Sequence, residues 1–200
     1  MKKYDYSNEL ANSIKQYLTE DKCRFECVEE YGFFHFYMGI RGRVHTIRYI
    51  IAVQKNEVMF YGICPITVDQ NDTEMLTQMS EFICCANYGT RNGNFELDFR
   101  DGEIRYKSYI DASNILPSKE IVRNSISCIA AMYELYSEGI ADIIFGASSA
   151  EEAFMKCKNG LNGESFSTFS EGRENSSEEK ETSSGEETRI RMNLFDEENE

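Results

Sequence analysis

The 200-residue sequence has no excess of basic residues and no long hydrophobic run. Its 21 Lys and Arg are outnumbered by 35 Asp and Glu, so the formal net charge is −14. Because nucleic acids and anionic lipids are bound through clustered cations, this balance argues against both as partners. No apolar run approaches the roughly 20 residues that cross a bilayer, and Asp5, Asn8 and Glu9 stand where a signal peptide needs an apolar core. We therefore expect a cytoplasmic protein without membrane association.

Patterns typical of metal and phosphate sites are also missing. The two histidines, His35 and His45, have no Cys or carboxylate at a spacing that would complete a metal site. No glycine-rich loop follows a strand and opens a helix, as a phosphate cradle requires. We predict no cofactor and no metal. The odd set of seven cysteines contains no C-x-x-C pair, and we expect mostly buried, reduced thiols at Cys23, Cys27, Cys64, Cys84, Cys85, Cys128 and Cys157.

Composition divides the chain near Lys158. Residues 158–200 are rich in Ser, Glu, Gly and Asn, and they hold 12 acidic and 5 basic residues, which is half of the net charge. Such a stretch cannot bury enough apolar surface to offset the entropy of ordering it. We predict one folded domain over residues 1–157 and a disordered acidic Ser/Glu-rich tail over residues 158–200.

Apolar residues at spacings of three and four predict the helices. The first begins near Ser7, and the second follows a capping box at residues 71–74. A long third helix begins after Ser118, and we expect Gly139 to bend or break it. A short final helix begins at residues 148–151.

Period-two alternation and β-branched residues predict strands at residues 33–40, 47–53 and 58–64, with a short extended segment at residues 22–28. Residues 94–110 form a hairpin, because Asp101-Gly102 is a preferred pair for a two-residue turn. This turn places Phe99 and Leu97 on the buried side, facing Ile104 and Tyr106. It also predicts three ion pairs on the other side: Arg100 with Glu103, Asp98 with Arg105, and Glu96 with Lys107. Glu96 and Asp98 are therefore interpreted as cross-strand ion pairs and not as a catalytic dyad.

Three short runs resemble a known family: Ala86-Asn87-Tyr88-Gly89, Gly93 to Asp98, and Asp101 to Tyr106. They are similar to the YbjN-like bacterial domain, which carries the label of a proposed bacterial sensory transduction regulator. The resemblance covers about residues 8–156. The positions that carry it are Asn87, Tyr88, Gly93, Asn94, Phe95, Glu96, Asp98, Gly102 and Arg105.

The resemblance implies a fold similar to type III secretion chaperones. We therefore expect an α+β domain with an antiparallel sheet of about five strands and helices on one side. The element order is helix, three strands, helix, two strands, helix. Proteins of this fold often dimerise and bind extended segments of other proteins. The family offers no catalytic residues to carry over.

The acidic tail contains one segment in which apolar and polar residues alternate. Such a segment could add as a strand to an exposed sheet edge, in cis or in trans, or its apolar residues could be chance occurrences in a solvated tail. A small basic spot at Arg41, Arg43 and Arg48 is either a solvated loop or a docking point for an acidic partner or for the protein's own tail. The candidate partner motif in the tail is Ile190, Met192, Leu194 and Phe195.

Three functional hypotheses follow. The leading one is a non-enzymatic protein-binding module, chaperone-like or regulatory, which binds an unnamed protein or peptide segment or a second copy of itself as a homodimer. The alternative is a signalling or sensory-transduction adaptor regulated through its acidic tail, where phosphate would add further charge at Ser176, Ser177, Ser183 and Ser184. An enzyme is the third hypothesis, although no nucleophile–base constellation is visible.

Overall fold

The computed structural model describes residues 5–163, and these form an α+β domain of four helices and six strands. The order of helices and strands predicted from the sequence is confirmed. One additional strand lies within residues 22–28, for which only a short extended segment was predicted. In chain order the elements are α1 (Asn8–Glu20), β1 (Glu26–Val28), β2 (Phe33–Gly39), β3 (Thr46–Val53), β4 (Glu57–Ile63), α2 (Thr73–Tyr88), β5 (Asn94–Leu97), β6 (Ile104–Asp111), α3 (Lys119–Ile144) and α4 (Ala150–Gly163).

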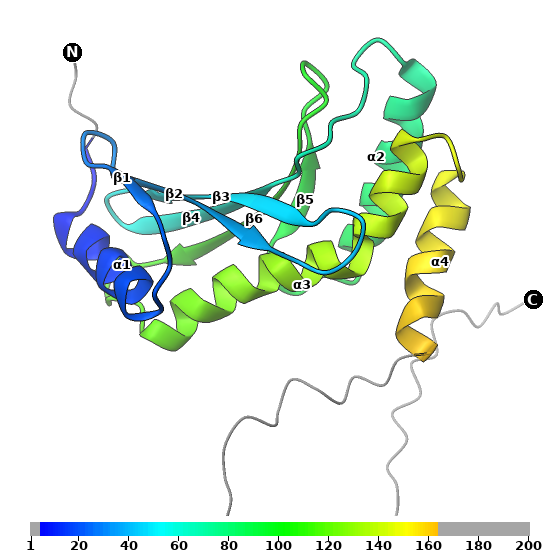
Figure 1. The fold of residues 1–200 in the computed structure, drawn as a ribbon. Coiled ribbons are helices and arrows are strands. Elements are labelled where there is room, and N and C mark those ends of the chain that lie inside the picture. The colour runs from blue at the N-terminus through cyan, green and yellow to red at the C-terminus, as the bar shows by residue number, and fades with distance from the viewer. Residues whose placement is uncertain (1–4, 164–200) are drawn as a thin grey trace, which may run out of the picture. The chain divides into compact units, whose positions relative to one another are not determined.

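The strands form a single antiparallel sheet with the order β1-β2-β3-β4-β6-β5. Figure 1 shows α1 and α3 beneath one face of this sheet, which we call the inner face. No helix among residues 5–163 covers the opposite, outer face. The predicted arrangement, with helices packed on one side, is therefore confirmed.

The core lies between the inner face and α3, because alternate strand residues and the apolar stripe of α3 point toward each other. The Phe36 and Tyr49 rings stack at 4.9 Å between centroids, and both side chains are buried. Burying each large apolar side chain contributes roughly 1.5 to 3 kcal/mol before the cost of ordering it. The stripe predicted for α3 is buried as expected and includes Val122, Ile126, Ile129, Tyr133 and Ile140.

Side chains cap the helix starts near the predicted positions, although the cap of α2 is Asp72, one residue later than the predicted box requires. Ser7, Asp72 and Ser118 each accept a hydrogen bond from a backbone N–H in the first turn of α1, α2 and α3. At the start of α4, the Ser149 backbone donates to Glu152 and the Glu152 backbone donates to the Ser149 hydroxyl. These bonds satisfy N–H groups that have no partner within the helix.

Of the two predicted effects of Gly139 on α3, a break is absent. The helix is continuous from Lys119 to Ile144. A Cβ atom at Gly139 would lie 2.5 Å from the Phe82 ring and 3.0 Å from the Cys157 sulfur. The glycine therefore serves the close packing of α2 and α4 against α3, which outweighs its weak helix propensity.

The predicted register of the β5–β6 hairpin is wrong by two residues. Glu96 lies opposite Arg105 and Leu97 opposite Ile104, so the strands end before the expected two-residue turn. The Asp98 N–H donates to the Glu103 carbonyl at 2.9 Å, which closes a longer loop. An even shift keeps each paired strand residue on its predicted face, but Phe99, expected to be buried, is 59% exposed in the loop.

The longer loop is held by a contact from outside the hairpin. Gly102 adopts a φ of +72°, and its carbonyl accepts the Val68 N–H at 3.0 Å. A Cβ atom there would lie 1.9 Å from the Val68 carbonyl oxygen, so only glycine fits. The contact with the β4–α2 connection thus determines the conformation of the β5–β6 loop, and it outweighs the local preference for a two-residue turn.

Candidate functional site

The outer face is the largest surface of the sheet that the described helices leave open, and pleating places alternate strand residues on it. Strand pairing aligns these side chains in three rows that cross the sheet. Tyr37 and Tyr109 are the most prominent, with 71% and 58% exposure. The first row is Tyr37, Arg48, Ile63, Arg105 and Glu96; the second is His35, Ile50, Tyr61, Lys107 and Asn94; the third is Phe33, Ala52, Met59 and Tyr109.

Ion pairs connect the rows. Glu96 accepts a hydrogen bond from Arg105 Nε at 2.7 Å and another from Lys107 Nζ. Burial raises the pKa of Glu96, but these two hydrogen bonds together outweigh burial, and the net pKa is lowered. A carboxylate held in this way stays ionised at neutral pH and is a poor general acid.

The Arg105 guanidinium also lies over an aromatic ring. Its central carbon is 5.0 Å from the Tyr61 ring centroid, within the range of a cation–π contact. Arg48 Nη2 is 3.8 Å from a Glu103 carboxylate oxygen. The cations of the outer face are therefore paired with acids or an aromatic ring, and its charges largely cancel locally.

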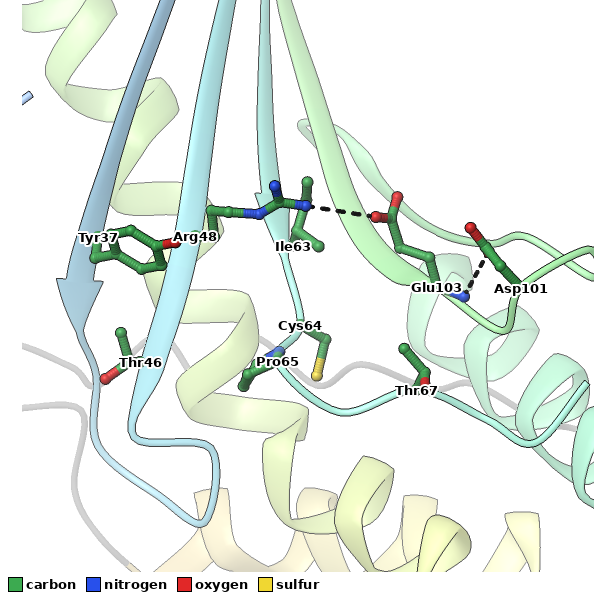
Figure 2. A pocket seen from close by; sticks show the side chains of 9 residues that line it. All are labelled: Tyr37, Thr46, Arg48, Ile63, Cys64, Pro65, Thr67, Asp101 and Glu103. Atoms are coloured by element: carbon green, nitrogen blue, oxygen red, sulfur yellow. Dashed lines mark hydrogen bonds and ion pairs between the residues drawn. The ribbon is translucent and has the colours of Figure 1, made fainter. Parts of the chain in front are cut away.

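One end of the outer face is hollowed (Figure 2). The hollow has a volume of about 530 Å³ and lies among β2, β3, the end of β4 and the β5–β6 loop. Figure 2 shows the Arg48–Glu103 ion pair spanning it, with Cys64 below. Burial raises the pKa of Cys64 to about 11, so little nucleophilic thiolate exists at neutral pH. The residues that line the hollow are Tyr37, Thr46, Arg48, Ile63, Cys64, Pro65, Thr67, Asp101 and Glu103.

The predicted family positions gather at the edge of the sheet formed by β5. Asn87 of α2 accepts the Phe95 N–H at 2.8 Å and donates to the Phe95 carbonyl at 3.0 Å. Its carboxamide thus takes the place of a neighbouring strand and satisfies the outward backbone of β5. The Phe95 ring packs edge-on against Tyr106 and Tyr133 in the core.

The remaining family positions lie around this edge. Gly93 directly precedes β5, and Asn94 donates from its side chain to the Phe95 carbonyl at 3.2 Å. Asp98 lies in the β5–β6 loop, where hydrogen bonds from Arg100 lower its pKa to about 2. Tyr88 is 83% exposed at the end of α2, and nothing in the structure explains its presence.

Other predicted candidates do not assemble into a site. His35 lies opposite Ile50 in the sheet, whereas His45 lies in the β2–β3 connection. Residues 5–163 contain no group of three or more His, Cys, Asp or Glu that could hold a metal ion. In the basic spot, Arg43 pairs with the buried Asp142, which also accepts from Lys156 at 2.6 Å. Arg43 therefore anchors the β2–β3 connection to α3 instead of offering a free charge.

The cysteines differ from our prediction in their exposure. All seven are free thiols, but only Cys64 and Cys157 are buried, while Cys84 and Cys85 are both exposed on α2. The prediction of mostly buried cysteines is wrong, because α2 turns only one of its faces toward the core.

The hollow and most of the outer face were not predicted from the sequence. Tyr61 and Tyr109 were not predicted to belong to a site, although residues 105, 107 and 109 alternate with buried residues, and this pattern indicates that the three share one face. The predicted tail, including Ile190, Met192, Leu194 and Phe195, lies outside the described residues. No helix between residues 5 and 163 is long and apolar enough to span a membrane.

Neither a family model nor a curated protein matches the sequence. Among solved structures, the chain is similar to YbjN from E. coli, which is described as a proposed transcription regulator. The match has a TM-score of 0.48 at 14% identity and covers 64% of this chain and 90% of that chain. The chain is thus similar in fold to a protein of the family that its sequence resembles, and the likeness concerns the fold alone.

Proposed function

We propose that this domain is a non-enzymatic protein-binding module, chaperone-like or regulatory, which contacts its partner through the outer face of the sheet. The observation that carries the proposal is the exposure of Tyr37 and Tyr109 on a face that no described helix covers. Tyrosines are enriched at protein interfaces because each offers a large apolar ring and a polar tip.

The surroundings of these tyrosines fit a protein partner. Ala52 and Met59 lie in the same row as Tyr109 and supply apolar surface, while the first two rows carry the paired charges. The ion pairs of Glu96 and Glu103 already hold their side chains in place. A partner would therefore meet an ordered surface and lose less conformational entropy on binding. The hollow beside Arg48 could accept a protruding side chain of that partner.

A binding role accounts better than catalysis for the polar groups of this face. Glu96 is held ionised by two cations, and the thiol of Cys64 is kept neutral by burial. Neither group is poised to transfer a proton or to attack a substrate near neutral pH. Ion pairing explains Glu96 and burial explains Cys64, without a reaction.

The test compares single tyrosine variants of the full chain. Wild type, Tyr37→Ala, Tyr109→Ala and Tyr88→Ala are each used to capture proteins from the native cell, with quantification by mass spectrometry. Tyr88 is the matched control because it is also exposed but lies on α2. We expect a set of proteins that is depleted with both outer-face variants and retained with Tyr88→Ala.

The opposite pattern of captured proteins would contradict the proposal. If the same proteins are retained by Tyr37→Ala and Tyr109→Ala but lost with Tyr88→Ala, the partner binds the helical side. Circular dichroism of each variant verifies that lost capture does not reflect lost folding.

A further inference from the structure

The charges around the hollow at the end of the outer face do not cancel. Its lining holds one cation, Arg48, and two acids, Asp101 and Glu103. Arg48 Nη2 lies 3.8 Å from a Glu103 carboxylate oxygen and offsets the charge of that acid. No ion pair among residues 5–163 involves Asp101. The lining of the hollow is therefore left with a net negative charge, which Asp101 carries.

Both carboxylates at the hollow can accept further hydrogen bonds. Among the described residues, the Asp101 carboxylate accepts only the Glu103 N–H, at 3.0 Å. Arg48 and Arg105 lie 3.8 and 4.0 Å from the Glu103 carboxylate, which is beyond hydrogen-bond distance. Because an ionised carboxylate can accept about four hydrogen bonds, a cation that enters the hollow can bond both acids without breaking a hydrogen bond of the domain.

The other walls of the hollow are apolar or aromatic. Figure 2 shows Tyr37 on the side opposite Asp101 and Glu103, with Ile63 and Pro65 between the two sides. The Tyr37 side chain is 71% exposed, so its ring is accessible to a partner. The volume of about 530 Å³ falls within the range of about 300 to 1,000 Å³ that is typical of ligand sites. The hollow is therefore large enough for a long side chain.

Arginine is the side chain that fits these walls best. Its aliphatic stem can lie on Ile63 and Pro65 while its guanidinium reaches the acids. The planar guanidinium carries a fork of N–H donors that can bridge two carboxylates, and it stacks on aromatic rings such as that of Tyr37. Lysine carries a compact, strongly hydrated charge and lacks both features. An acidic side chain would add to the negative charge, and an apolar one would cover Asp101 without giving it a partner.

We propose that the hollow binds an arginine side chain of the partner protein, with the guanidinium at Asp101 and Glu103 and the stem against Ile63 and Pro65. The arginine belongs to the segment that contacts the outer face, so the proposal rests on the proposed function. It narrows the partner to a protein that presents an exposed arginine.

The first test titrates the full chain with the peptide acetyl-Gly-Arg-Gly-amide and follows the backbone amides of the protein by NMR. The same peptide with citrulline in place of arginine is the matched control, because citrulline keeps the shape of the side chain but carries no charge. We expect the arginine peptide to shift the amides of Thr67, Asp101 and Glu103, and to bind at least about fivefold more tightly than the citrulline peptide. Equal affinity of the two peptides, tighter binding of acetyl-Gly-Glu-Gly-amide, or unchanged amides at these residues would overturn the proposal.

A double variant tests the role of the two acids. Asp101→Asn with Glu103→Gln keeps the size of both side chains, and the Asn oxygen can still accept the backbone N–H of residue 103. Without the two charges, the preference for arginine over citrulline should fall below about twofold. Asp98→Asn is the matched control, because it changes an acid of the same loop that does not line the hollow, and it should leave the preference unchanged. A preference that survives in the double variant would contradict the assignment.

The results separate this proposal from the proposed function. If the arginine peptide does not bind, but Tyr37→Ala and Tyr109→Ala still lose the captured proteins, arginine recognition is wrong and the outer face remains the binding surface. If the amides around the hollow shift when the protein is concentrated without peptide, a second copy of the chain fills the hollow, and the proposal is also overturned.

Discussion

The two faces of the sheet use the same residue type for different purposes. On the inner side, the hydroxyls of Tyr49 and Tyr133 donate to backbone carbonyls at 3.1 and 2.9 Å, and both rings are fully buried. On the outer face, Tyr37 and Tyr109 are mostly exposed, and no hydrogen bond within the described residues ends on either hydroxyl. The first pair is tied into the core, whereas the second pair remains available to a partner.

This difference shows that exposure and satisfied polar groups are better guides to function here than residue type. A buried tyrosine with a bonded hydroxyl contributes to folding through both its area and its hydrogen bond. An exposed tyrosine contributes little to folding, so its substitution should affect binding alone. The following variants test this contrast, from the largest expected change in stability to the smallest.

Tyr133→Ala should destabilise the protein by about 3 to 5 kcal/mol, because it removes a buried ring and leaves a cavity. Tyr109→Ala should change the free energy of unfolding by less than about 0.5 kcal/mol. Urea denaturation of the full chain measures both. Tyr133→Phe, which keeps the ring, should lose only about 1 kcal/mol. If Tyr133→Ala and Tyr109→Ala lower the free energy of unfolding equally, the proposed difference between the two faces is contradicted.

Asn87→Ala should cost about 1 to 3 kcal/mol, because it leaves the Phe95 N–H without its partner and leaves the Phe95 carbonyl with only the bond from Asn94. The amide of Phe95 should also exchange faster with solvent, as hydrogen-exchange mass spectrometry can measure. Asn114→Ala, in an exposed loop, is the matched control and should change neither quantity. Unchanged exchange at Phe95 in Asn87→Ala would mean that the β5 edge does not depend on this carboxamide.

Glu96→Gln should reduce the dependence of stability on pH. The pKa of Glu96 is lower in the folded state than in the unfolded state. Ionised Glu96 therefore stabilises the fold fully above the unfolded-state pKa, and this stabilisation is lost as the pH falls through the folded-state pKa. Between about pH 5 and pH 3, the wild type should therefore lose more stability than Glu96→Gln, by less than about 1 kcal/mol. Urea denaturation across this range measures the difference, with Glu81→Gln as the exposed control. If the stability of the wild type and of Glu96→Gln falls in parallel as the pH is lowered, the ion pairing of Glu96 is contradicted.

The sequence predicted features that depend on neighbouring residues. The stripe of α3 and the Ser118 cap follow from spacings within a few turns, and both are present. The hairpin register could not be predicted in the same way, because Val68 closes against Gly102 from a distant connection. The local Asp-Gly preference was outweighed by that tertiary contact.

The candidate site was less predictable for a related reason. Tyr37, Arg48 and Ile63 come from three strands and Glu103 comes from the β5–β6 loop, and only the pairing of the strands places these residues around one hollow. The role of Asn87 could not be predicted for the same reason. The residue is one of the positions that carry the family resemblance, but its hydrogen bonds to Phe95 depend on how α2 packs against β5.

The most direct test of the proposed function is hydroxyl-radical footprinting of the full chain, free and in complex with a captured partner. We predict that oxidation of Tyr37 and Tyr109 falls in the complex, while oxidation of Tyr88 and Phe145, exposed at the ends of α2 and α3, stays unchanged. Protection of Tyr88 and Phe145 with unchanged oxidation of Tyr37 and Tyr109 would contradict the assignment of the outer face as the binding surface.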